Sequence, residues 1–220
     1  YEADSAKQWG SPFQPKLSVD SDYQWLQPAV YGSGEDSGLV LSDGKSNIFL
    51  VRRATSPQPN LEMQTEAPVS GSPLVTPLAV VGDTVYAGNQ VGRLSRYSLP
   101  GLEPQEDIAL GGSVVWGPHS TGDYLLLTTG DSQMVCIDRQ GAIAWQQSLE
   151  HGHPTGAPLV DGESVTLVWQ QSGLSQVNLT SGAESGYTEM PQPVVTGPVA
   201  FGPRLLLTTA DGALLILDRP

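Results

Sequence analysis

The sequence is poor in the residues that build redox and metal sites. Its 220 residues include a single cysteine, Cys136, which rules out a disulfide within the chain and a CxxC redox or metal pair. Because Cys136 lies in the apolar run 134–137, we expect it to be a buried structural thiol. The chain has three histidines, and no GxSxG, HExxH or P-loop pattern occurs in it.

Basic residues are also scarce. Ten Lys and Arg stand against 23 Asp and Glu, which gives a formal net charge of -13, and no lysine follows Lys45. A surface that binds nucleic acid or an anionic membrane needs clustered Lys and Arg, so both kinds of partner are excluded. No apolar stretch approaches the roughly 18 residues of a membrane-spanning helix. The chain begins at Tyr1, and we expect a mature or trimmed form that a signal or an anchor would precede.

Glycine and proline, in contrast, are frequent and evenly spread. The 25 Gly and 18 Pro predict many turns rather than a linker, and the apolar positions show no helical periodicity. Four segments align at a period of 40 residues, and each has a turn glycine: Gly82, Gly122, Gly162 and Gly202. A small residue followed by proline precedes every one of these glycines. A polar residue near the end of the predicted third strand recurs with the same spacing: Asp138, Asn178 and Asp218. Three landmarks in one register indicate an internal repeat.

Each repeat divides into short strands separated by turns. In the best-defined repeat, strands are expected at 113–116, 124–129 and 134–138, and a third turn with the outer strand at 140–147. The pair of a small residue and proline falls in the first strand, where proline is tolerated if that strand is the inner edge of a sheet. The pattern predicts an all-β fold, a β-propeller built from four-stranded blades around a central channel.

A diverged fifth repeat lies upstream, with strands expected at 25–31, 38–42, 46–51 and 61–65. We therefore predict one propeller domain over residues 1–220 with five blades: 25–70, 71–111, 112–152, 153–192 and 193–220. The last blade lacks an outer strand, and we expect residues 1–24 to supply it and close the ring, through residues 7–9 or 16–19. The alternative, a fragment of a larger propeller, stays open.

The repeat at 121–147 carries a family resemblance. Its aliphatic strand, Gly-Asp turn, Ile-Asp-Arg and Gln-Gly-Ala-Ile-Ala-Trp resemble the repeat of quinoprotein-type (PQQ-like) propellers, with Trp145 as the terminal tryptophan. The resemblance covers residues 72–219 well and 25–66 loosely. It implies a propeller blade, but the family includes both quinone-dependent dehydrogenases and a branch of cofactor-free scaffolds. Quinone-binding members resemble one another in having eight blades, adjacent cysteines and a calcium cage. This chain departs from that pattern, so no cofactor is expected.

Six residues form the candidate ligand or partner face: Trp116, His119, His151, His153, Asp131 and Asp211. Trp116 and His119 flank a Gly-Pro pair and could line the channel or pack it. His151 and His153 are spaced to face one metal, but the further ligands that zinc needs are missing, so we expect a solvated turn and no metal.

The two aspartates lie in second turns of their repeats, where bonding of Asp to its own backbone explains them. A glycosidase needs two acids that converge on the substrate. The predicted inner strands carry none, so no catalytic residue is assigned.

These observations predict a non-catalytic binding or scaffold propeller that engages a protein or peptide partner through its loop face. The alternative is a carbohydrate-binding or glycoside-processing propeller, acting through Trp116, His119 and loop acids. The polar, lysine-poor composition and the PQQ-like resemblance favour an extracytoplasmic location.

Overall fold

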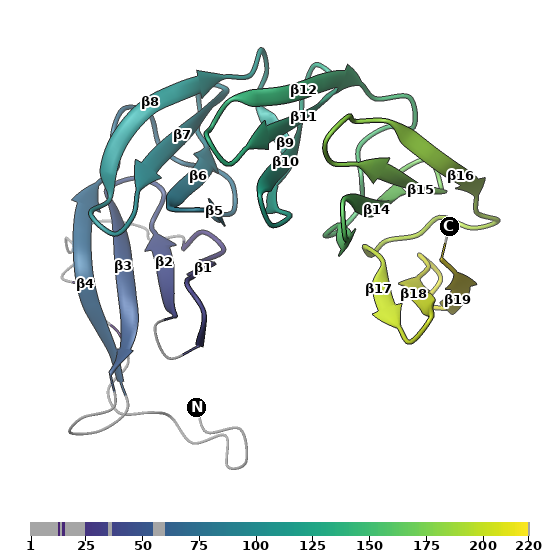
Figure 1. The fold of residues 1–220 in the computed structure, drawn as a ribbon, viewed down its shortest axis with the longest axis horizontal. Coiled ribbons are helices and arrows are strands. Elements are labelled where there is room, and N and C mark those ends of the chain that lie inside the picture. The colour runs from purple at the N-terminus through teal and green to yellow at the C-terminus, as the bar shows by residue number, and fades with distance from the viewer. Residues whose placement is uncertain (1–12, 14, 16–24, 35–36, 55–59, 220) are drawn as a thin grey trace. The chain divides into compact units, whose positions relative to one another are not determined.

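The computed structural model describes residues 13, 15, 25–34, 37–54 and 60–219. Within these residues the regular elements are nineteen β-strands in five antiparallel sheets (Figure 1). Each sheet falls inside one of the five predicted blade intervals. The all-β fold with four-stranded blades is confirmed. The segments 7–9 and 16–19, predicted to close the ring, lie outside the described residues.

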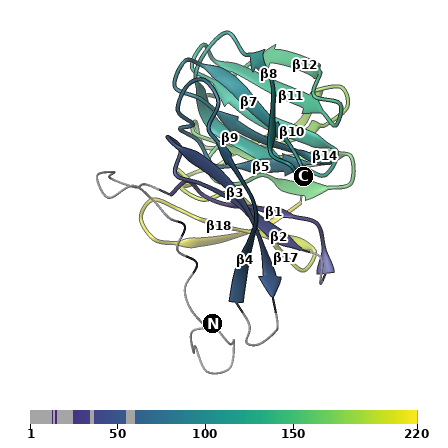
Figure 2. The same ribbon diagram turned by 90° about the vertical axis from the view of Figure 1, so that its left-hand side faces the viewer.

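Contacts along the chain define two compact units, Tyr1–Ile108 and Ala109–Pro220. The first unit holds two sheets of four strands, each in chain order. The strands of the first sheet are β1 (Ala29–Tyr31), β2 (Gly38–Ser42), β3 (Asn47–Ala54) and β4 (Asn60–Pro68). Those of the second are β5 (Ala79–Val81), β6 (Thr84–Gly88), β7 (Arg93–Ser98) and β8 (Glu103–Ala109). The hairpin of β3 and β4 is the longest of the described chain (Figure 2).

The second unit holds three sheets. The third sheet consists of β9 (Val114–Ser120), β10 (Tyr124–Thr129), β11 (Gln133–Asp138) and β12 (Ile143–Ser148). The fourth consists of β13 (Leu159–Asp161), β14 (Ser164–Trp169), β15 (Gly173–Asn178) and β16 (Glu184–Glu189). The fifth consists of β17 (Val199–Phe201), β18 (Arg204–Thr208) and β19 (Leu214–Asp218). Among the described residues the fifth sheet therefore has three strands, as the sequence predicts.

The repeat landmarks occupy the turns that they predict. Gly122 and Gly162 join the first and second strands of their sheets with φ angles of 89° and 61°. This left-handed backbone costs little for glycine and is strained for residues with a Cβ. The regular spacing of these glycines thus records one turn geometry repeated along the chain.

Within each unit the core lies between neighbouring sheets. In the third sheet, Leu125, Leu126 and Leu127 of β10 are all fully buried. Leu126 and Cys136, on one face of the third sheet, pack against residues of the fourth such as Val165 and Val177. A strand buried on both faces has no polar side to present, which explains why the second strands are runs of consecutive apolar residues.

Cys136 is a free, buried cysteine, as the sequence predicts. Burial, together with the nearby Asp138 carboxylate, raises the pKa of its thiol to about 12. The reactive thiolate is therefore scarce at neutral pH.

The first strands differ from the prediction. Only β9 contains its Gly-Pro pair. In the second, fourth and fifth sheets the strand starts after the proline, and the residues before it form isolated bridges: Leu74 with Asn89, Pro154 with Trp169, and Val194 with Thr209. Proline has no N–H to donate and so interrupts the ladder. One consequence corrects the expectation that inner strands carry no acid: Asp161 lies in β13, where it accepts a 2.9 Å hydrogen bond from Arg219.

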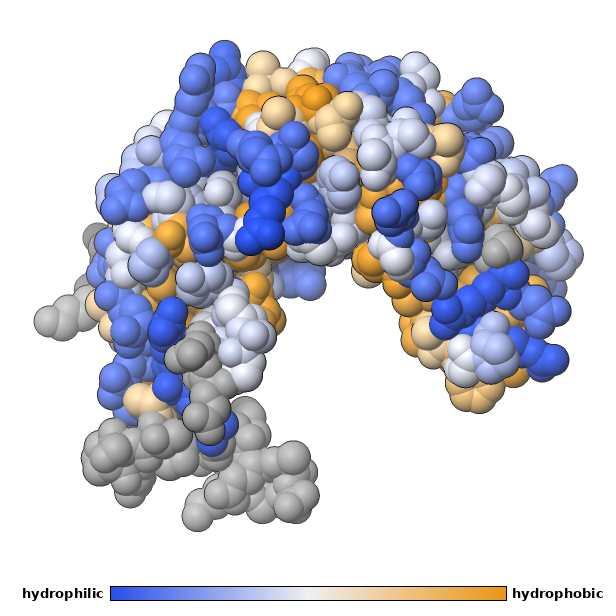
Figure 3. Space-filling model, viewed as in Figure 1, coloured by the Kyte–Doolittle hydropathy of each residue, from blue (hydrophilic) through white to orange (hydrophobic). Residues whose placement is uncertain are grey.

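The fifth sheet has one buried and one exposed apolar face. Leu205 and Leu207 pack toward the fourth sheet. On the other face, Phe201, Leu214 and Ile216 are 50% exposed or more. Figure 3 shows apolar side chains over this sheet, at the lower right.

Candidate binding site

Trp116 packs in the contact between the third and fourth sheets, and His119 lies against its ring. Trp116 is 9% exposed, and its Nε1 donates a 2.7 Å hydrogen bond to the carbonyl oxygen of Gly156. The His119 ring lies 4.4 Å from the Trp116 ring, and burial lowers the pKa of His119 below its ordinary value. Of the two roles that the sequence allows, the contacts of Trp116 support packing.

His151 and His153 do not converge on one point. Nδ1 of His153 lies 2.8 Å from the hydroxyl of Thr128, on β10. Nε2 of His151 lies 3.4 Å from a carboxylate oxygen of Glu184. The two imidazoles therefore bind different partners and do not form one site. Among the described residues, no group of three or more His, Cys, Asp and Glu side chains is placed to hold a metal ion.

Asp131 and Asp211 have the same local role in two different sheets. Each carboxylate accepts a hydrogen bond from the threonine two residues before it, Thr129 or Thr209. The bond from Thr209, with one from the Ala213 amide, lowers the pKa of Asp211. The backbone bond predicted for a turn-forming aspartate is thus present at Asp211, whereas the bond to the Asp131 carboxylate comes from a side chain.

Trp145 connects the third and fourth sheets. Its Nε1 donates to the carbonyl oxygen of Leu179 at 2.7 Å. Its ring covers Gly182, where a Cβ would come within 2.9 Å of ring atoms. The terminal tryptophan of the repeat thus contacts the last turn of the following sheet.

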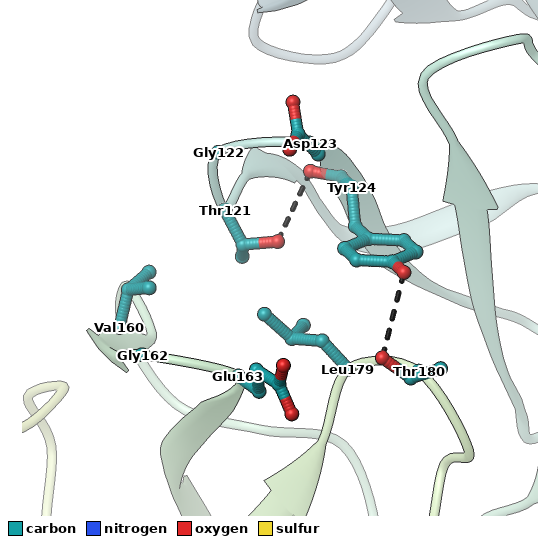
Figure 4. Close-up of a pocket in the computed structure, with 9 residues that line it drawn as sticks. All are labelled: Thr121, Gly122, Asp123, Tyr124, Val160, Gly162, Glu163, Leu179 and Thr180. Carbon is teal, nitrogen blue, oxygen red and sulfur yellow. Dashed lines mark hydrogen bonds between the residues drawn. The ribbon is translucent and has the colours of Figure 1, made fainter.

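A groove on the loop side of these two sheets, which we call the loop-face groove, has a volume of about 510 Å³ (Figure 4). Its lining comes from three turns: Thr121, Gly122, Asp123 and Tyr124; Val160, Gly162 and Glu163; Leu179 and Thr180. Figure 4 shows the Leu179 side chain pointing into the groove, with the Glu163 carboxylate beside it. The Tyr124 hydroxyl lies 3.5 Å from that of Thr180, so the two sheets also meet through polar groups here.

A second groove, the rim groove, lies beside the outer strands of the same sheets and has a volume of about 490 Å³. It is lined by Gln147, Ser148, Leu149, Glu150, His151, Trp169, Gly182, Ala183 and Glu184. The His151 ring stacks on Tyr187 at 3.9 Å and meets Trp169 edge-on at 5.8 Å. Sequence reasoning singled out His151 but missed Glu184 and Tyr187, which lie on the polar outer strand β16.

A chain of polar contacts fixes one wall of the rim groove. Trp169 donates from Nε1 to Ser175 at 2.8 Å, and the Ser175 hydroxyl donates to Glu184. The second sheet has the counterpart: Nδ2 of Asn89 donates to Ser95 and to Asp107, both at 3.0 Å. Ser95 and Ser175 are two repeat periods apart in the sequence. A serine that recurs at this spacing is the signal by which the sequence could have indicated the network.

No helix among the described residues has the length and apolar character to cross a membrane. Comparison with curated proteins gives no match. Among solved structures, BamB from Moraxella catarrhalis aligns with a TM-score of 0.65 and 15% identity over 92% of this chain and 59% of that one. BBS1N, solved in complex with ARL6DN, aligns with a TM-score of 0.66 and 17% identity, over 90% and 61%. Apo AztD from Citrobacter koseri aligns with a TM-score of 0.58 and 15% identity, over 79% and 49%.

The chain thus spans about three fifths of the length of the first two structures, and the likeness at these identities is one of fold. A model of PQQ-like repeats, described as outer membrane protein assembly factor BamB, matches residues 101–219, more than half of the chain. The expected PQQ-like repeat is therefore confirmed, and the chain belongs to the BamB family of β-propellers.

Proposed function

We propose that this chain is a non-catalytic scaffold that binds a partner protein through the loop-face groove. The observation that carries the proposal is the groove itself, which combines an apolar floor with a polar rim. Val160 supplies exposed apolar surface above the buried Leu179, and Glu163 and Thr180 supply acceptors at the edge of the groove. Such a mixture suits a polypeptide segment, which has apolar side chains to bury and backbone N–H groups to pair.

The charges at the groove favour a partner with hydrogen-bond donors. Asp123 is already paired with Arg139 at 3.3 Å, but both side chains are more than half exposed, so this ion pair contributes little and is easily replaced. Val160 is 43% exposed, and Glu163 is exposed as well. These side chains are therefore accessible to a partner.

The similar proteins support a scaffold role. The family description is that of an assembly factor, and the similar BBS1N structure is a complex with a second protein.

The carbohydrate alternative loses its main support. It depends on Trp116 as a stacking surface for sugar, but that side chain is buried and its N–H is bonded to Gly156. We also propose an extracytoplasmic location, in line with the family description. Fractionation of cells that express the full-length gene tests it, and recovery in the cytosolic fraction would contradict it.

Photo-crosslinking in cells tests the proposed function. A crosslinking residue replaces Glu163 in the groove or, as a control, Glu106 on the outer strand β8; both glutamates are exposed. We expect one dominant protein adduct from position 163 that is absent from position 106. We also expect Val160→Asp to reduce it at least tenfold, because the charge removes apolar contact area. Equal adducts from both positions would refute the assignment of this groove.

A further inference from the structure

The rim groove has an excess of hydrogen-bond acceptors and of negative charge. Glu150 and Glu184 are among its lining residues, which include no lysine or arginine. The whole second unit, residues 109–220, has ten Asp and Glu, three Arg and no Lys. All three arginines are paired elsewhere: Arg139 with Asp123, Arg204 with Asp218, and Arg219 with Asp161. None of these arginines pairs with a carboxylate of the groove, whose Glu184 lies beside the His151 imidazole.

The position of Glu184 is fixed. Ser175, which is fully buried, donates to one of its oxygens, and Nε2 of His151 lies 3.4 Å from the other. Ser175 is itself held by the Trp169 indole at 2.8 Å. The Glu184 side chain is nonetheless 25% exposed, so the groove presents a carboxylate that is held in place and still reachable.

The ring of His151, which lines the groove, packs against a second ring, that of Tyr187. Tyr187 lies over Gly173, where a Cβ would come within 2.3 Å of a Tyr187 ring carbon. His151 stacks on Tyr187 with an angle of 20° between the rings. The stack therefore depends on the glycine, and it sets flat rings next to the carboxylate.

The second sheet contains a similar hydrogen-bond network, and comparing the two shows how Glu184 differs from its counterpart, Asp107. Its counterpart network is complete, because both N–H groups of the Asn89 amide are used, by Ser95 and Asp107. In the fourth sheet, tryptophan replaces asparagine and its single N–H reaches only the serine. Glu184 thereby loses the direct amide donor that Asp107 has. Its second oxygen is left facing His151 and the groove.

We infer that the rim groove binds an arginine side chain of a partner protein, with the guanidinium paired to Glu184 and set against the His151–Tyr187 stack. A guanidinium is planar, carries five donors, is weakly hydrated and stacks on rings, which matches a fixed carboxylate beside two stacked rings. The inference rests on the proposed scaffold function but concerns a site separate from the loop-face groove.

A peptide titration tests the inference. The probes are acetyl-Gly-Arg-Gly-amide and the same peptide with citrulline, which has the shape of arginine without its charge. The readout is the Trp169 indole N–H resonance of the ¹⁵N-labelled protein. We expect a saturable shift with the arginine peptide and at least tenfold weaker binding of the citrulline peptide. Equal shifts with both peptides, or no saturable shift, would overturn the inference.

Two variants locate the site. Glu184→Gln keeps an acceptor for Ser175 and is expected to weaken arginine binding at least tenfold, whereas Glu106→Gln makes the same charge change on β8 and should have no effect. Gly173→Ala displaces Tyr187 without any charge change and should weaken binding several-fold. Unchanged binding in Glu184→Gln would refute the site. Val160→Asp leaves the rim groove intact, so its effect on crosslinking reports on the loop-face groove alone.

Discussion

The indole N–H of Trp145 donates to the carbonyl oxygen of Leu179 at 2.7 Å, across the contact between the third and fourth sheets. The same carbonyl oxygen is 3.5 Å from the Cys136 sulfur, so two groups of the third sheet meet one acceptor of the fourth. Trp145 is half-buried and Leu179 is 2% exposed. If the Trp145 donor were removed, water could not readily replace it at this buried carbonyl oxygen.

Trp145→Phe removes the donor and keeps most of the ring. We expect a loss of about 1 kcal/mol in the free energy of unfolding, the usual net contribution of such a hydrogen bond. Urea unfolding followed by circular dichroism measures it. Trp25→Phe is the control, because Trp25 is 44% exposed. A loss for Trp145→Phe no larger than that of the control would contradict the role of this bond.

Gly182→Ala tests the packing under the same ring. Gly182 has a φ of 75°, and its Cβ would meet Trp145 at 2.9 Å. Gly71 has the same φ with open space around it, so Gly71→Ala reports the backbone strain alone, about 1 kcal/mol. We expect Gly182→Ala to lose more stability than Gly71→Ala, by about 1 kcal/mol or more for the displaced ring. Equal losses would show that Trp145 moves away freely.

Stability should fall at alkaline pH because of Cys136. Burial raises the pKa of the thiol from 9.0 to about 12, so the folded state keeps a proton that the unfolded state loses. This contribution is complete below pH 9 and declines as the pH rises from 9 toward 12. Urea unfolding of the wild type and Cys136→Ala between pH 8 and 11 measures it. As the pH rises, the free energy of unfolding of the wild type should fall relative to that of Cys136→Ala. A difference that does not change with pH would count against a buried thiol.

Asn89 is expected to be the most sensitive position of the second sheet. Its side chain is 2% exposed and joins Ser95 and Asp107, while its Oδ1 accepts from the amides of Val91 and Arg93. Asn89→Ala leaves all of these groups without their partner, and we expect a loss of about 2–3 kcal/mol. Hydrogen exchange at the Arg93 amide should accelerate in parallel. Gln90→Ala, on the exposed neighbour, is the control, and a similar small loss in both variants would disprove the network.

The repeat made the fold predictable. Glycines at a spacing of 40 residues fix the turns, and the second strand predicted at 124–129 matches β10 residue for residue. The first strands were less predictable, because a small-Pro pair belongs to the strand in β9 and precedes it in β5, β13 and β17. The small-Pro pair alone therefore does not tell where the first strand begins.

The rim groove could not be read from the sequence for a different reason. Its contacts join His151 to Glu184 and Tyr187, which are more than 30 residues away on the outer strand of the next sheet. That strand is exposed along its whole length and has no apolar alternation to mark it. Only the pair His151 and His153 was conspicuous in the sequence, and the prediction there was a solvated turn rather than a histidine with a carboxylate partner.

The affinity of the crosslinked partner tests the scaffold role most directly. Once that protein is identified and purified, calorimetry measures its dissociation constant for the wild type, Val160→Asp, Glu163→Lys and the control Glu106→Lys. Binding through the loop-face groove predicts at least tenfold weaker binding for both groove variants, equivalent to about 1.4 kcal/mol, and no change for the control. The same dissociation constant for all four proteins would contradict it.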